Sequence, residues 1–168
     1  MKLLDLILPE FDQEMATTRK LLERVPTDRG EWKPHPKSFS LGHLAQLVSM
    51  MPGWITRTVK DTELNVVGGP GYSYQATEVL LASFDRNVRE AREALLAASE
   101  PDFDVSWSLK AGETVLFTET RRTVVWQTIN HLVHHRGQLS VYLRMVDVPL
   151  PSIYGPTADE PWGKAQGE

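Results

Sequence analysis

The spacing of apolar residues constrains this chain most, because four long stretches carry the three- and four-residue steps of an amphipathic helix. The pattern predicts helices over residues 4–24, 41–60, 75–99 and 123–145. In the first of these, one face gathers Phe11, Met15, Thr18, Leu21 and Leu22. Four helices of similar length with loops between them favour an all-α fold, a four-helix bundle.

The segments between the helices carry turn-forming residues. Residues 25–40 are interrupted by proline and glycine and end at Ser40, a predicted helix N-cap, and residues 65–74 are a glycine-rich loop. Residues 103–122 alternate polar and apolar side chains, which predicts a short extended excursion or hairpin before the last helix. The proline-rich tail is irregular and is expected to pack over the bundle, so residues 1–168 form a single domain.

Composition excludes several classes of protein. The formal net charge is −4 without a block of basic residues, which argues against a nucleic-acid-binding surface. The chain has no cysteine, so it offers no disulfide and no thiol nucleophile, and nitrogen or oxygen must bind any metal. It shows neither a signal-peptide pattern nor the roughly 18 apolar residues of a membrane span, so a cytoplasmic location is expected.

The segment NHLVHHRGQ, residues 130–138, holds three of the five histidines. His131 and His135 are four residues apart and share one face of the predicted helix, so both imidazoles can bind one divalent ion. His134 lies about 100° around the helix from each of them and is expected at the surface. Arg136 is a candidate partner for a carboxylate, and Gln138 is a candidate hydrogen-bond partner for a ligating imidazole.

Two stretches of the chain are similar to proteins of the DinB-like family. One is NHLVHHRGQLSVYLRMVDVPLPSIYGPTADE, which resembles the family's closing segment, and the other is RVPTDRGEWKPHPKSFSLGHLAQL followed by MPGW. The resemblance implies a four-helix bundle of the DinB-like type, a divalent metal held by three histidines, and often a homodimer. It also implies a relation to metal-dependent transferases that use a small thiol such as bacillithiol or mycothiol.

The resemblance carries two metal ligands onto His131 and His135. Many relatives place the third ligand where this chain has Leu47, whereas the histidine here is His43, one turn earlier and about 6 Å away along the axis. The site has therefore moved by one turn, binds metal weakly or is lost. The predicted ligand set is His43, His131 and His135, with zinc or nickel as the expected metal.

Several functions remain open at this point. The first is a metal-dependent thiol S-transferase, in which the metal activates an external thiol. A metal-dependent hydrolase would use the same ligands, and a non-catalytic bundle could bind a small ligand or act in a stress response. DNA binding is the weakest alternative because the chain is acidic. Aromatic residues that would serve either a homodimer interface or the core are Trp54, Trp126, Tyr142 and Trp162.

Overall fold

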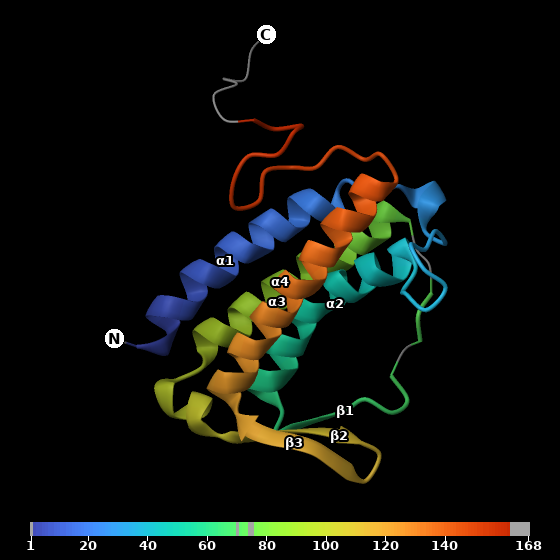
Figure 1. Ribbon diagram of the computed structural model, residues 1–168. Coiled ribbons are helices and arrows are strands. Elements are labelled where there is room, and N and C mark those ends of the chain that lie inside the picture. The colour runs from blue at the N-terminus through green and yellow to red at the C-terminus, as the bar shows by residue number, and fades with distance from the viewer. Residues whose placement is uncertain (1, 70, 74–75, 162–168) are drawn as a thin grey trace.

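The computed structural model describes residues 2–69, 71–73 and 76–161 and shows four long helices with a small sheet at one end (Figure 1). No helix within these ranges is both long enough and apolar enough to cross a membrane. The predicted start of the third helix at residue 75, and Trp162, lie outside the described residues. The elements are α1 (Leu3–Leu22), η1 (Thr27–Arg29), α2 (Leu41–Lys60), β1 (Glu63–Asn65), α3 (Thr77–Ala97), η2 (Glu100–Asp104), β2 (Ser106–Ala111), β3 (Thr114–Thr120) and α4 (Arg121–Met145).

Hydroxyl side chains cap the two helices that carry the candidate histidines. The Ser40 hydroxyl accepts a hydrogen bond from the backbone N–H of His43 at 3.3 Å, which confirms the predicted start of α2. The Thr120 hydroxyl accepts one from the N–H of Thr123 at 3.4 Å at the start of α4. Each cap satisfies an N–H that has no partner within its helix, and so fixes where the helix begins.

The sheet has the strand order β1-β2-β3, with β1 parallel to β2 and β2 antiparallel to β3. Gly112 turns the predicted hairpin with a φ of +61°, a left-handed conformation that glycine adopts without strain. The side chain of Asn65 binds both the N–H and the carbonyl of Gly112 at 3.1 Å and so holds the turn against β1. The hairpin is confirmed, whereas β1 was missed because three residues are too few to show a period.

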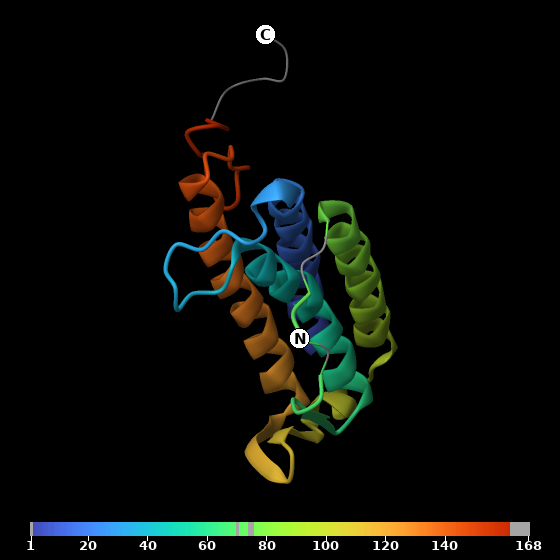
Figure 2. The ribbon, with the colours of Figure 1, turned by 90° about the vertical axis from the view of Figure 1, so that its right-hand side faces the viewer.

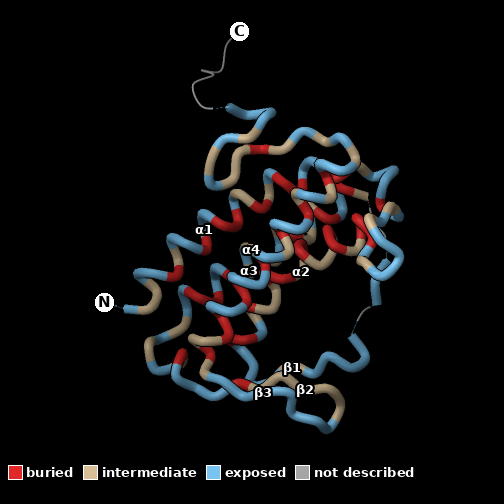
Figure 3. Tube along the Cα trace, in the orientation of Figure 1, coloured by how far each residue is buried: buried red, intermediate tan, exposed pale blue. Residues whose placement is uncertain are grey.

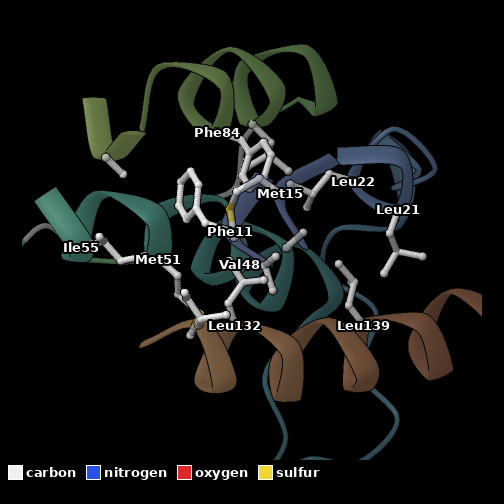
Figure 4. Close-up of a cluster of buried hydrophobic side chains, with 14 of the residues drawn as sticks. Phe11, Met15, Leu21, Leu22, Val48, Met51, Ile55, Phe84, Leu132 and Leu139 are labelled. Carbon is white, nitrogen blue, oxygen red and sulfur yellow. The ribbon is translucent and has the colours of Figure 1, made fainter. Parts of the chain in front are cut away.

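The core lies between the four helices, and each helix turns one face toward it (Figure 3). Phe11 and Met15 of α1 meet Phe84 of α3, and Val48 of α2 lies beside Leu132 of α4 (Figure 4). The predicted apolar face of α1 is confirmed, since all five of its predicted inward residues are buried. Helical spacing therefore predicts the bundle, because burial of one face per helix supplies most of its stability.

The tail after α4 folds back over the end of the bundle opposite the sheet, as expected (Figures 1 and 2). Arg144 of α4 forms an ion pair with Asp159, and Arg24 forms one with Glu160 at 3.3 Å. The same two carboxylates accept hydrogen bonds from the backbone N–H groups of Leu150 at 2.8 Å and Ser152 at 2.7 Å. The hydrogen bonds join residues 150–152 of the tail to residues 159–160, and the ion pairs attach the tail to α4 and to the loop after α1.

Candidate functional site

The two histidines of α4 converge on one point at the surface of the helix. The Nε2 atoms of His131 and His135 lie 2.9 Å apart, and Oε1 of Gln138 lies 2.7 Å from Nδ1 of His135. An amide oxygen only accepts, so Nδ1 of His135 carries the proton and its Nε2 accepts a hydrogen bond from Nε2 of His131. The predicted contact between Gln138 and an imidazole is confirmed.

The surroundings of His131 favour its neutral form. Its ring lies against Trp54 of α2, with ring centroids 5.9 Å apart. Desolvation by this packing, followed by repulsion from His135 and His134, lowers the pKa of His131 below its ordinary value of 6.5. Metals bind the neutral form of imidazole, so the environment favours the state that a ligand needs.

His134 lies outside the pair but is linked to it. Its ring is exposed, as predicted, and its Nε2 accepts a hydrogen bond from Nε2 of Gln138 at 3.1 Å. Gln138 thus holds His135 through its oxygen and His134 through its nitrogen. The role of His134 is consequently to orient Gln138 rather than to join the convergent nitrogens.

His43 is placed in a different environment. Its ring stacks on Tyr72, with centroids 4.3 Å apart and an angle of 14°, and it also touches Phe39 at 4.3 Å. Desolvation by burial, followed by the charge of Lys33, lowers the pKa of His43 below 6.5. Nowhere in residues 2–69, 71–73 and 76–161 do three or more histidine or carboxylate side chains gather in a metal-binding arrangement.

The geometry of the bundle explains this placement. Helices α2 and α4 run antiparallel, because Arg121 at the start of α4 donates to the carbonyl of Asp61 just after α2 at 3.0 Å. Trp54 lies level with His131, and His43 is eleven residues before Trp54, about 16 Å along the axis. His135 is only about 6 Å beyond His131 in the same direction. His43 is therefore about 10 Å from the level of His135, which is too far to share a metal ion with the pair.

An apolar pocket opens between α2, α4 and the sheet beside the histidine pair. Its volume is about 410 Å³, within the range of roughly 300–1,000 Å³ that is typical of small-molecule sites. His131 lies on its wall, so the pocket and the histidine pair are contiguous. The lining residues are Trp54, Thr58, Leu64, Val66, Trp107, Leu109, Phe117, Val124, Gln127, Thr128 and His131.

Trp107 is the unusual residue of this pocket. It is 3% exposed, yet it stands apart from the main core cluster, as does Val124 at 5%. Its indole N–H is buried and has no hydrogen-bond partner among the described residues. An unpaired buried donor costs about 1–3 kcal/mol. Sequence reasoning missed this residue. A signal was present, because Trp107 and Leu109 are two residues apart in the predicted hairpin and so lie on one face of it, and Leu109 pairs with Phe117.

A buried charge cluster lies on another face of the same helix segment. Arg136 and Glu14 are each 1% exposed, and Nη1 of Arg136 lies 2.6 Å from Oε2 of Glu14. The Tyr154 hydroxyl donates to the Glu14 carboxylate at 2.9 Å and accepts from Nη2 of Arg136 at 2.7 Å. The predicted carboxylate partner of Arg136 is confirmed, and the cluster joins α1, α4 and the tail.

Four packed helices, a small sheet before the last of them and a histidine pair on that helix define a histidine-bearing four-helix bundle. The model of the DinB family matches residues 1–165, and the chain belongs to this family.

Two solved structures are similar in fold. A DinB-like protein from Bacillus subtilis has a TM-score of 0.69 at 20% identity, over 88% of this chain and 96% of that one. A DinB-like protein from Bacillus cereus has a TM-score of 0.67 at 20% identity, over 88% of this chain and 95% of that one. No protein of curated description matches the chain. These likenesses establish the DinB-like fold that the sequence predicted.

Proposed function

We propose that this DinB-family protein binds a divalent metal ion, zinc or nickel, at His131 and His135 and acts as a metal-dependent thiol S-transferase. The observation that carries the proposal is the 2.9 Å approach of the two Nε2 atoms. Two nitrogens bound to one tetrahedral zinc, each at about 2.0–2.1 Å, lie about 3.4 Å apart. A widening of about half an ångström therefore admits the ion, and Gln138 already holds His135 in the ligating tautomer.

The third ligand remains the open part of the site. His43 is the proposed third ligand from the sequence, and to reach the pair it would have to leave Phe39 and Tyr72 and travel along the bundle. The residues as placed fit two protein ligands for one ion and do not fit three. A bound divalent ion lowers the pKa of a coordinated thiol or water molecule, which is the chemistry that a transferase or a hydrolase of this type requires.

Metal titration tests the proposal. Protein purified without a polyhistidine tag is titrated with zinc and with nickel by calorimetry, and its metal content is measured by mass spectrometry. We expect one ion per chain, lost in both His131→Ala and His135→Ala. His35→Ala is the matched control, because His35 is exposed in a loop and its Nδ1 accepts only the N–H of Lys37. Equal binding by wild type and both pair variants would contradict the proposal.

The same titration shows whether His43 is a metal ligand. If it is a ligand, His43→Ala loses the metal as fully as His131→Ala does. If the site is a two-histidine site, His43→Ala binds as the wild type does, and Leu47→His tightens binding at least tenfold. Leu47 is about 4–5 Å beyond His135 along the axis, so a histidine there is one turn closer to the pair than His43 is.

A second candidate is a non-catalytic bundle that binds a small ligand. The aromatic stacking of His43, away from the histidine pair, favours it. A protein that binds neither zinc nor nickel and does not transfer bacillithiol or mycothiol to an electrophile such as monobromobimane would favour this candidate over the transferase.

We also propose a homodimer. Apolar side chains on the outer surface of α4 support it, since Val141 is 57% exposed, Met145 55% and Trp126 45%. Light scattering should give twice the chain mass of 19.0 kDa. A mass equal to that of one chain would contradict the proposal.

A further inference from the structure

We propose that the pocket between α2, α4 and the sheet binds a neutral, largely apolar small molecule with an aromatic or branched ring system. The inference goes beyond the proposed metal chemistry and does not require a metal. It rests on the lining of the pocket and on its contact with His131.

The walls of the pocket select against charge. None of its lining residues is an aspartate, glutamate, lysine or arginine, and His131 is its one titratable side chain. A buried charge is costly unless an opposite charge pairs with it. The apolar walls come from Trp54 of α2, Trp107 and Leu109 of β2, and Phe117 of β3. The buried part of the ligand is therefore uncharged, and three aromatic rings favour a flat ring system.

The walls of the pocket offer few free hydrogen-bonding groups. The Thr58 hydroxyl donates to the carbonyl of Trp54 at 2.9 Å, and the Thr128 hydroxyl donates to the carbonyl of Val124 at 2.8 Å. Both hydroxyl protons are thus used within their own helices. The indole N–H of Trp107 has no acceptor within the described chain, but it is buried and a molecule in the pocket does not reach it. The part of the ligand that contacts these walls is therefore apolar.

The polar residues at the rim of the pocket set the expected orientation of the bound ligand. Gln127 and His131 are exposed and line the same pocket as the buried Trp107. An apolar ligand in this pocket can therefore carry a polar group at its exposed end, beside the histidine pair. Trp54 contacts His131 and lines the pocket, so a bound molecule lies next to the convergent imidazoles.

A matched pair of neighbouring valines tests the location. Val66 is 51% exposed and lines the pocket, whereas Val67 is 65% exposed and does not. Binding of the neutral fluorescent probe N-phenyl-1-naphthylamine is measured in the presence of EDTA, so that a failure of metal binding does not affect the result. We expect saturable binding of one probe per chain, weakened at least tenfold in Val66→Trp and less than twofold in Val67→Trp.

A second measurement tests the selection against charge. Competition against the probe compares 2-acetylnaphthalene, which is neutral, with 2-naphthoate, which carries a carboxylate. The wild type should prefer the neutral ketone by about tenfold or more, because the walls of the pocket offer no opposite charge. Absence of saturable binding, equal loss in the two valine variants, or no preference for the neutral ligand would each overturn the inference.

Discussion

The helix α4 carries two sites that face different ways and differ in how completely their polar groups are paired. Arg136 and Glu14 are buried, and Arg136, the Glu14 carboxylate and the Tyr154 hydroxyl bond to one another. Five residues before Arg136, His131 borders an apolar pocket in which the Trp107 N–H has no partner within the described residues. The first site has its polar groups paired within the chain, whereas the second leaves a buried donor unpaired and a volume open beside the histidine pair.

This difference assigns stability to the cluster of Arg136, Glu14 and Tyr154 and ligand binding to the pocket. A buried ion pair whose hydrogen bonds are satisfied holds the surrounding elements in one arrangement, and here those elements are α1, α4 and the tail. An apolar pocket with an unpaired buried donor in its wall contributes less to stability and leaves volume for a bound molecule. Substitutions at the two sites should therefore differ in the property that they change.

The largest change in the free energy of unfolding is expected from Arg136→Met. Removal of the guanidinium leaves the Glu14 carboxylate buried without its counter-charge, which should lower the free energy of unfolding by about 3–5 kcal/mol. Urea unfolding followed by circular dichroism measures it. The double variant Glu14→Leu with Arg136→Met should recover most of the loss, because apolar residues can replace a buried ion pair. A single variant as stable as the wild type would remove the contrast between the two sites.

Tyr154→Phe should have the next largest effect. The hydroxyl bridges Glu14 and Arg136 although most of the ring is exposed, so its loss leaves buried groups without a partner. The expected decrease in the free energy of unfolding is about 1–3 kcal/mol. Tyr142→Phe is the control, since Tyr142 packs on Trp32 with ring centroids 5.7 Å apart. Equal losses in the two variants would assign the effect to packing rather than to the hydroxyl.

The contribution of Tyr154 should disappear at alkaline pH. Desolvation by burial, followed by its hydrogen bond to Glu14, raises the pKa of Tyr154 above its ordinary value of 10.0. A raised pKa in the folded state means that the stabilisation is complete below pH 10 and is lost as the pH rises through the folded-state pKa. The stability difference between wild type and Tyr154→Phe should be constant below pH 10 and should shrink as the pH rises above it. A constant difference would show that the hydroxyl is not the titrating group.

The smallest change in the free energy of unfolding is expected from His135→Ala, one residue before Arg136. Its ring is partly exposed and contacts His131, His134 and Gln138, so the free energy of unfolding should change by less than about 1 kcal/mol. Metal titration should nevertheless show a complete loss of the ion. A large loss of stability would instead make the histidine pair part of the structural framework.

The fold followed from local patterns to a large degree. The apolar spacing of Phe11, Met15 and Thr18, the cap at Ser40 and the turn at Gly112 each depend on residues close in sequence. The convergence of His131 and His135 followed for the same reason, because positions four apart share a helix face. The strand β1 did not follow, since its three residues are defined only by their pairing with β2.

The sequence by itself determined the helices, the hairpin and the histidine pair, because hydrogen bonds and side-chain periodicity within a helix or hairpin act over a few residues. Tertiary structure alone decided that Glu14 is the partner of Arg136, which is 122 residues away. It also decided that His43 stacks on Tyr72 and that Trp107 lines a pocket beside His131. These outcomes depend on how helices, strands and loops that are distant in sequence pack against each other, and no local pattern records that packing.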